Sequence, residues 1–485
     1  MATYVRQAVV IVHGMGEQRP LETLTGFIDS ALAPDPDGDR LYYSRPESVT
    51  GSFESRRFLA PRSPRFPEEP ERHAHTEFFE YHWSHLMQGN RLDDLWPTFR
   101  RMLLLPPTRV PHGLKGFWLL SWVAIVAAAW AFVWGPWSGV VGKGDLLPKI
   151  IATFVSGGLL AALISYVFAR ILPGWLTSSF VDVTRYLDTS PRSYGVRRDI
   201  REGFVTLLQG LHESGKYDRI VLVAHSLGAF IAYDGVSHLW GLMNGKHAGS
   251  HSPEVLGGLA ELERAASDLP DPAITQGGSA SGPQLVSAFQ EAQRGLWRGL
   301  RAQGNGWLIS DFVSVGTPMY FADQLLAGRG ATSFSRRIAR RELPTCPPQN
   351  EENPANNING TTRFYSWPKA NFEGGRRVER RVIYEGAPFA VVRWTNLYFP
   401  VSRGFFGDWF GGPLAPLFGN GIRDVPITGN GPSARDATWW RNRHVPAAAH
   451  AYYFEFPEDD TPSSVTTHLR DALGLASSTW VPPRP

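Results

Sequence analysis

A serine flanked by small residues separates two apolar segments of different character. Residues 220–223 read IVLV and suit a buried strand, whereas residues 229–233 have the apolar spacing of a helix. Between them lies AHSLG, residues 224–228, which follows the pattern Gly-x-Ser-x-Gly with Ala224 in place of the first glycine. A turn of this kind lifts the hydroxyl of Ser226 clear of the sheet, where it can act as a nucleophile. The alternative interpretation is an ordinary strand-to-helix turn with a capping serine.

A nucleophilic serine needs an imidazole to take its proton and a carboxylate to orient that imidazole. We expect the carboxylate in the loop after a late strand. Residues 390–399 read as such a strand, and Asp408 follows it. Asp424 and, beyond the sequence GTP at 316–318, Asp323 are the alternatives.

The histidine is expected in a loop near the C-terminal end of the sequence. Two candidates lie there, His444 and His450. His450 directly precedes the aromatic segment AYYFEF at 451–456, which can anchor the loop that carries it. We therefore favour His450 as the base and keep His444 as the alternative.

A second glycine-rich turn follows the first predicted strand, residues 4–12. It begins with His13-Gly14 and continues through Met15. A backbone N–H at such a turn can stabilise an oxyanion, although a plain strand-to-helix turn has the same composition. His13 is expected to brace this loop and not to act as a base.

The remaining elements predict an α/β fold with a mostly parallel sheet flanked by helices. Residues 196–213 have helical apolar spacing and lead directly into the strand that precedes Ser226. Further helices are predicted over 253–266 and 284–303, and a further buried strand over 307–315. Repeated strand, helix and strand units are typical of parallel sheets. Residues 246–283 are rich in Gly, Ser and Pro and predict an insertion, either a lid or an inert surface segment.

Two uncharged apolar segments interrupt this pattern. No residue from 116 to 142 is charged, and residues 150–169 form a second uncharged run. About 20 apolar residues suffice for a helix to cross a bilayer, so we predict a transmembrane helical hairpin over 113–176. Arg and Lys gather outside the two runs, which by the positive-inside rule places the flanking segments on the cytoplasmic side. A pair of helices buried in a soluble core is the alternative.

The composition restricts the binding partners, cellular compartment and cofactors that we expect. Lys and Arg total 48 against 45 for Asp and Glu, and no basic block with interleaved aromatics predicts nucleic-acid binding. Cys346 is the only cysteine, which excludes an internal disulfide and suits a reducing compartment. The N-terminal residues do not predict a signal peptide. His73, His75, His82 and His85 are interpreted as surface and strand-end residues, so we expect no metal and no cofactor.

Several motifs together resemble the serine esterase and lipase branch of the α/β-hydrolase superfamily. They are HGMGEQ, VAHSLG, DFVSVGTP, WTNLYF with GGPL after it, and HAYYF. The resemblance implies that Ser226 is the nucleophile, His450 the base and Asp408 its orienting acid. It also implies an oxyanion hole formed by the backbone N–H groups of Met15 and Leu227.

The expected function is a membrane-anchored serine hydrolase that cleaves ester or thioester bonds, with the bilayer as a partner and lipids or acylated molecules as substrates. Residues 1–112 and 177–485 form the two parts of the expected hydrolase domain, on either side of the hairpin. A catalytically silent hydrolase fold that serves as a membrane scaffold is one alternative. An acyltransferase or peptidase with the same triad is another.

Overall fold

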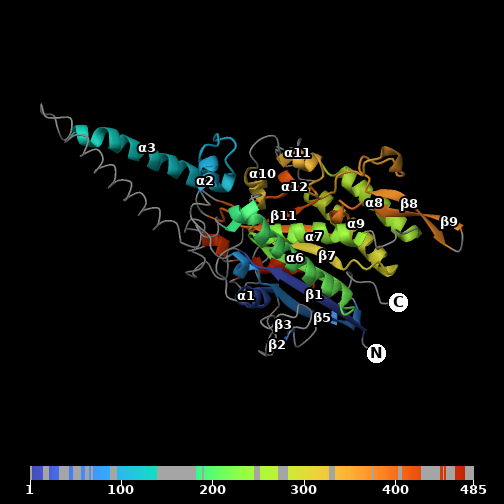
Figure 1. The fold of residues 1–485 in the computed structure, drawn as a ribbon. Coiled ribbons are helices and arrows are strands. Elements are labelled where there is room, and N and C mark those ends of the chain that lie inside the picture. Colours follow the sequence, from blue (N-terminus) through green and yellow to red (C-terminus); the bar gives the residue numbers. More distant parts are fainter. Residues whose placement is uncertain are drawn as a thin grey trace.

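A mostly parallel β-sheet forms the centre of the computed structural model, and helices cover both of its faces (Figure 1). The predicted α/β class is therefore confirmed. The structure describes residues 3–14, 21–31, 43–46, 56–59, 65–66, 69–87, 96–138, 182–187, 191–244, 252–270, 282–326, 334–373, 376–401, 407–427, 448–451, 453–454 and 465–475.

The strand order in the main sheet is β11-β10-β7-β6-β1-β5-β3-β2, and β4 pairs with β5. Neighbours from β11 to β5 are parallel, whereas β2, β3 and β4 form an antiparallel edge. The strands are β1 (Thr3–Val12), β2 (Tyr43–Pro46), β3 (Arg56–Leu59), β4 (Arg65–Phe66), β5 (Glu69–Tyr81), β6 (Arg219–His225), β7 (Ile309–Val315), β10 (Arg393–Tyr398) and β11 (Arg423–Pro426).

Alternation along β1 explains why the sheet is covered on both sides. Val10 and Val12 pack into the apolar core on one face, and Val9 and Ile11 pack into the core on the other. Val10 pairs with Phe79 of β5 and with Leu222 of β6. Segments before and after 113–176 thus contribute neighbouring strands to one sheet.

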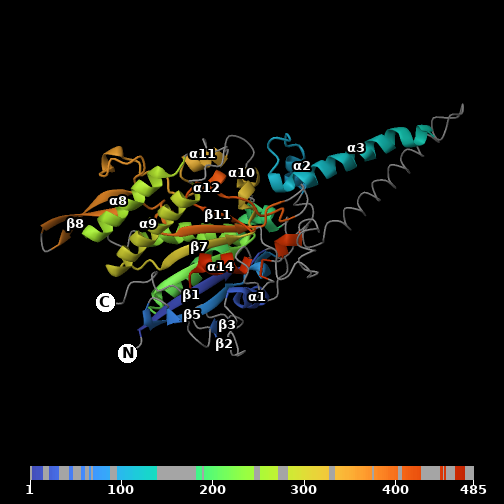
Figure 2. The same cartoon turned by 180° about the vertical axis from the view of Figure 1, so that it is seen from behind.

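Helices α6, α7 and α9 contribute to the core on one face, and α1 and α14 cover the other face (Figure 2). The helices are α1 (Glu22–Ala31), α2 (Trp96–Leu103), α3 (Lys115–Ser138), α6 (Pro191–Glu213), α7 (Gly228–Asn244), α8 (Pro253–Asp268), α9 (Gly282–Ala302), α10 (Ala322–Leu325), α11 (Phe334–Ala339), α12 (Ala415–Phe418) and α14 (Val465–Leu473). Short 3₁₀ helices occur at Ser84–Met87, His112–Leu114, Pro318–Phe321, Pro354–Asn356, Pro388–Ala390 and Ala448–Ala451.

The elements around Ser226 match their predicted positions closely, and β10 shows the main difference. The strand expected from residue 390 begins at Arg393, because Pro388 opens a 3₁₀ turn over Pro388–Ala390. Proline fixes φ near −65° and lacks the N–H that a sheet requires, so the strand starts only after this turn. A separate antiparallel hairpin, β8 (Ser366–Glu373) with β9 (Arg376–Ile383), lies beside α8.

Helix α3 covers most of the first apolar run and projects away from the sheet (Figure 1). Its base is attached to α2, since Trp118 and Trp122 both donate their indole N–H groups to the Leu103 carbonyl, at 2.9 and 3.0 Å. Within the described ranges, no helix meets the length and hydropathy required of a membrane span. The second apolar run, residues 150–169, lies outside the described residues.

Candidate active site

Ser226 occupies the sharp turn between β6 and α7. Its φ is 55°, in the left-handed region that side-chain-bearing residues rarely adopt, and its side chain is buried. The Ser226 N–H donates to the carbonyl of Val315 at 3.0 Å, which ties the turn to the end of β7. The strained conformation is held by neighbouring strands and is the geometry expected of an elbow that presents a hydroxyl.

Glycines allow the turn after β1 to lie directly against this elbow. A Cβ atom at Gly228 would lie 2.4 Å from the carbonyl oxygen of Val12 and 2.6 Å from that of His13. A Cβ atom at Gly14 would lie 2.8 Å from Nδ1 of His225. Both positions therefore require glycine, because any side chain would force the two turns apart.

His450 links Ser226 to Asp408. The distance from its Nε2 to Ser226 Oγ is 2.9 Å, and the distance from its Nδ1 to Asp408 Oδ1 is 3.0 Å. All three residues are buried. An ionised carboxylate only accepts, so Nδ1 carries a proton toward Asp408 and Nε2 of the neutral ring is free to accept the hydroxyl proton.

Asp408 is itself held in a fixed orientation. The Phe410 N–H donates to Oδ1 at 2.8 Å, and the Tyr453 hydroxyl donates to Oδ2 at 2.8 Å. Gly316 and Gly411 leave room for the carboxylate, since a Cβ atom on either would lie within 3 Å of Oδ2. The carboxylate thus faces His450 with no freedom to rotate away.

Two residues that the sequence analysis did not single out complete this arrangement. Tyr453 also accepts a hydrogen bond from the Phe399 N–H at 2.9 Å, which connects Asp408 to the end of β10. His225 Nε2 donates to the carbonyl of His450 at 3.0 Å. Burial lowers the pKa of His225 to about 3, so this ring is a neutral donor that fixes the backbone of His450. The aromatic segment after His450 and the histidine before Ser226 were the available signals.

The alternative acids lie in other environments. Asp424 accepts hydrogen bonds from the N–H groups of Leu414 and Ala415, each at 2.9 Å, and from Asn396 Nδ2 at 2.6 Å. It therefore holds the start of α12, and burial raises its pKa to about 6. Asp323 accepts a hydrogen bond from its neighbour Gln324. His444, the alternative base, lies outside the described residues.

The predicted oxyanion-hole donors can be placed only in part. Leu227 lies directly before α7, so its N–H points from the positive end of a helix, and no acceptor for this N–H is found among the described residues. Met15 lies outside the described residues. The adjoining Gly14 contacts the elbow, as the close approach to His225 shows.

His13 braces the turn after β1, as predicted. Its Nδ1 donates to the Gly14 carbonyl at 2.9 Å, and its Nε2 accepts the Trp83 N–H at 3.2 Å. Its ring stacks on Trp83, whose indole N–H donates to the His13 carbonyl at 3.1 Å. Burial lowers the pKa of His13 to about 3, and the ring has no nitrogen left for a reacting group.

The other histidines of the first segment contact different neighbours. His75 Nε2 contacts Glu77 at 3.4 Å, and His82 stacks on His85. Among the described residues, no group of three or more ligands has the arrangement of a metal site.

The site as a whole can transfer a proton from a hydroxyl to a ring nitrogen and stabilise the resulting ring charge. In the chain, the serine comes first, the carboxylate second and the imidazole last, as Ser226, Asp408 and His450. We compared the chain with protein-family models, curated proteins and solved structures, and none of them matched it.

Proposed function

We propose that the protein is a serine hydrolase of the α/β-hydrolase type that cleaves ester or thioester bonds through an acyl-enzyme. One observation supports this most strongly: the hydrogen-bonded series Ser226, His450 and Asp408, with distances of 2.9 and 3.0 Å. A fortuitous contact between three side chains does not explain why the serine has a positive φ. It also does not explain why the carboxylate accepts hydrogen bonds from a tyrosine hydroxyl and a backbone N–H.

In the proposed reaction, Ser226 Oγ attacks the carbonyl carbon of the substrate while its proton moves to His450 Nε2. Asp408 stabilises the imidazolium that forms. The C–O or C–S bond of the tetrahedral intermediate then breaks, and His450 returns the proton to the leaving alkoxide or thiolate. A water molecule then gives a proton to His450 and attacks the acyl carbon. The bond between this carbon and Ser226 Oγ breaks, His450 returns the proton to Oγ, and the acid is released.

The negative charge on the substrate oxygen requires donors close to Ser226. The Leu227 N–H is the described candidate, because it lies at the N-terminal end of α7 and the helix dipole favours an anion there. The Met15 N–H is the proposed second donor. Loss of a single donor of this kind costs about 10²–10³ in rate in serine hydrolases.

Attachment to a membrane through 113–176 remains part of the proposal, with the hydrolase on the cytoplasmic side. It is supported by α3, where Leu119, Val123, Val126 and Trp130 are between 56% and 66% exposed. An apolar surface of this kind is costly in water. A nearby bilayer would favour lipids or acylated molecules as substrates.

Labelling with a fluorophosphonate tests the catalytic proposal. We expect the full-length protein to be labelled and Ser226→Ala and His450→Ala to lose the label, while His444→Ala keeps it. Ser237→Ala is the matched control, because this serine lies on α7, directly after the turn that carries Ser226, and its hydroxyl donates to the Tyr233 carbonyl. Absence of any Ser226-dependent label in folded protein would favour the silent scaffold instead.

Substrate class and membrane attachment need separate experiments. The labelled enzyme should hydrolyse dispersed phospholipids or acylated thioesters faster than short soluble esters. Full-length protein should stay with the membrane fraction after an alkaline carbonate wash, and V123K/V126K should be released more readily. Recovery of the unmodified protein in the carbonate supernatant would contradict the attachment.

A further inference from the structure

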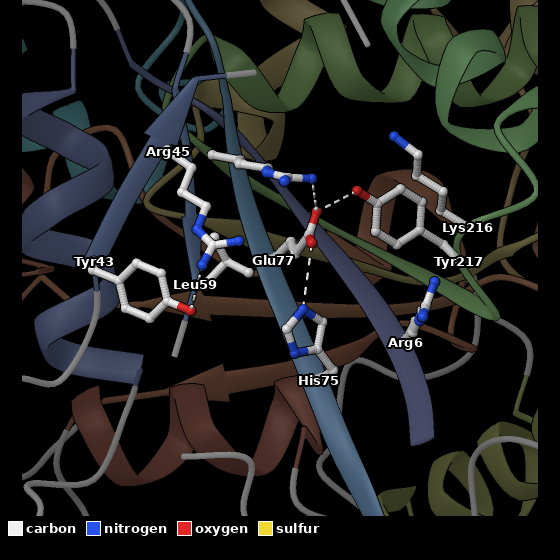
Figure 3. A pocket seen from close by; sticks show the side chains of 9 residues that line it. Arg6, Tyr43, Arg45, Leu59, His75, Glu77, Lys216 and Tyr217 are labelled. Atoms are coloured by element: carbon white, nitrogen blue, oxygen red, sulfur yellow. Dashed lines mark hydrogen bonds and ion pairs between the residues drawn. The ribbon is translucent and has the colours of Figure 1, made fainter. Parts of the chain in front are cut away.

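A second polar pocket lies on the antiparallel edge of the sheet, away from Ser226 (Figure 3). It has a volume of about 500 Å³ and is formed by β1, β2, β3, β5 and the loop between α6 and β6. Arg6 in this pocket precedes His13 by seven positions on β1, which corresponds to roughly 23 Å at about 3.3 Å per residue. The pocket is therefore not a subsite of the serine.

Basic side chains lie directly opposite one another across the strands of this pocket. Arg45 of β2 pairs in register with Arg57 of β3, and Arg6 of β1 pairs with His75 of β5. Lys216 approaches from the loop before β6 (Figure 3). Like charges at directly opposed positions destabilise a sheet, so the opposed arginines Arg45 and Arg57 destabilise this edge.

The carboxylate that lines the pocket does not balance these charges. Glu77 already accepts from Tyr217 at 2.5 Å, from Arg57 at 3.4 Å and from His75 at 3.4 Å (Figure 3). Burial raises its pKa, but the hydrogen bonds from His75 and Tyr217 and the charge of Arg57 outweigh this and keep the pKa below its ordinary value. Glu77 thus supplies one fixed negative charge whose oxygens are both in use.

Hydrogen-bond donors remain available around Glu77. Arg57 Nε is buried, and no acceptor for it is found in the part of the chain that the structure describes. Over the same residues, neither Arg6 nor Lys216 forms an ion pair, and both side chains are exposed. Asp218, the nearby carboxylate, accepts the backbone N–H of Arg6 at 2.9 Å.

We propose that this pocket binds a phosphate-bearing ligand with at least two negative charges. Arginine matches the oxygens of a phosphate in a forked geometry, and Lys216 adds a point charge. Arg6, Arg45, Arg57 and Lys216 leave three positive charges in excess over Glu77, and a ligand with two negative charges would offset two of them. The ligand is either a soluble phosphate or diphosphate compound or the headgroup of an anionic phospholipid, and binding does not depend on the function proposed for Ser226.

Binding of inorganic pyrophosphate to the full-length protein, followed by calorimetry at low salt, tests the site. We expect saturable binding that weakens at least about tenfold in Arg45→Gln and in Arg6→Gln/Lys216→Gln, since a charge-assisted hydrogen bond is worth about that factor. Arg340→Gln is the matched control, because this exposed arginine lies near Glu342, far along the chain from the pocket. Its affinity for pyrophosphate should be unchanged.

Thermal unfolding separates binding from a structural role of the arginines. Without ligand, Arg45→Gln should unfold at the same temperature as the unmodified protein or higher, because an opposed cation is removed. With pyrophosphate, only the unmodified protein and Arg340→Gln should gain stability. Failure of pyrophosphate to bind the unmodified protein, or an equal loss of affinity in Arg340→Gln, would overturn the proposal.

Vesicles distinguish the two sources of the phosphate. Phosphatidylcholine vesicles with and without phosphatidic acid are compared for the unmodified protein and for Arg6→Gln/Lys216→Gln. Recruitment by phosphatidic acid that is lost in the variant assigns a lipid headgroup. Pyrophosphate binding without such recruitment assigns a soluble ligand. Fluorophosphonate labelling of Ser226 should be the same in all these variants. A negative result for phosphate binding can therefore be distinguished from a negative result for the proposed hydrolase activity.

Discussion

Strand β6 carries a buried polar network at each of its ends, and the two networks differ in kind. At its start, Arg219 forms an ion pair with Asp311 at 2.6 Å and donates to Ser310 Oγ, to Gln7 Oε1 and to the Leu473 carbonyl. Arg393 pairs with the other oxygen of Asp311, also at 2.6 Å. Burial raises the pKa of Asp311, but the two arginines outweigh this and keep it below its ordinary value.

At the other end, Ser226 and His450 form a network that contains a movable proton. Its serine holds a strained φ, and the neighbouring buried histidines His13 and His225 are neutral. The fixed charges at the start of β6 hold neighbouring strands together, whereas the strained serine at its end lies beside an imidazole nitrogen that can accept its proton.

The largest expected effect concerns Asp408, the carboxylate of the network at the end of β6. Asp408→Asn should slow fluorophosphonate labelling by about 10⁴-fold, because the amide cannot orient His450 in the required tautomer. Asp424→Asn is the control, since that carboxylate holds α12. Rates are measured by quenched time courses on folded protein. Equal losses in both variants would remove the distinction drawn between these two acids.

The next prediction concerns the charged network at the start of β6. Asp311→Asn leaves Arg219 and Arg393 without a balancing charge and should lower the free energy of unfolding by about 3–5 kcal/mol. Asp471→Asn, which removes an exposed pair with Arg423, should cost less than about 1 kcal/mol. Urea denaturation measures both. If the folded Asp311→Asn protein also loses Ser226 labelling, the two ends of β6 are not independent.

A third test uses pH at the carboxyl end of β5. Glu80 accepts the Leu21 N–H at 2.6 Å, and burial raises its pKa from 4.5 to about 7. The folded state therefore holds this proton more tightly than the unfolded state. This contribution to stability is fully present below pH 4.5 and is lost as the pH rises through 7.

Glu80→Gln should accordingly gain stability relative to the unmodified protein by about 3 kcal/mol as the pH rises from about 4.5 to 8. Gln keeps an acceptor for Leu21 but cannot ionise. Unfolding free energies across this range provide the measurement. A difference between the two proteins that does not change with pH would contradict the assigned burial of the carboxylate.

The smallest expected effect is the release of strain at Ser226. Both Ser226→Gly and Ser226→Ala lose the hydroxyl, but only glycine adopts a φ of 55° without steric cost. Ser226→Gly should therefore be about 1 kcal/mol more stable than Ser226→Ala. Equal stabilities in chemical denaturation would show that the elbow is relaxed, and the contrast between the two ends of β6 would weaken.

Much of the sheet could be predicted from the sequence, because buried parallel strands have continuous apolar runs. Residues 4–12 and 220–223 lie in β1 and β6, and the predicted helix over 196–213 lies in α6. The strand predicted over 307–315 corresponds to β7, which begins two residues later, at Ile309. The short strand β11 and the helix α14 were not predicted, since four residues of β11 show no period and α14 is amphipathic within a polar segment.

The site residues whose order along the chain is constrained could be predicted from the sequence. Residues that come together only through three-dimensional packing could not. Asp408 and His450 could be placed in the chain, although their catalytic roles stay predictions. Tyr453 could not be recognised as the partner of Asp408, because an aromatic residue after a histidine has many ordinary uses. The charged pocket was equally hidden, since Arg6, Arg57 and Lys216 are scattered in sequence and meet only through strand register.

The placement of β1 between β5 and β6 has a consequence for how the chain folds. Gln7 and Arg219 are hydrogen-bonded across 212 positions, and Ser226 and His450 across 224. Contacts between residues this far apart in the sequence form slowly. β1 and β5 can therefore pair early, but the rest of the sheet can be added only after β6 has been made. During synthesis, the edge of β1 in the parallel β1–β5 pair stays uncovered until β6 has been made, and β6 begins 138 residues after β5 ends (219 − 81). Folding yield should therefore depend on protection of this early unit, by chaperones or by the remainder of the nascent chain.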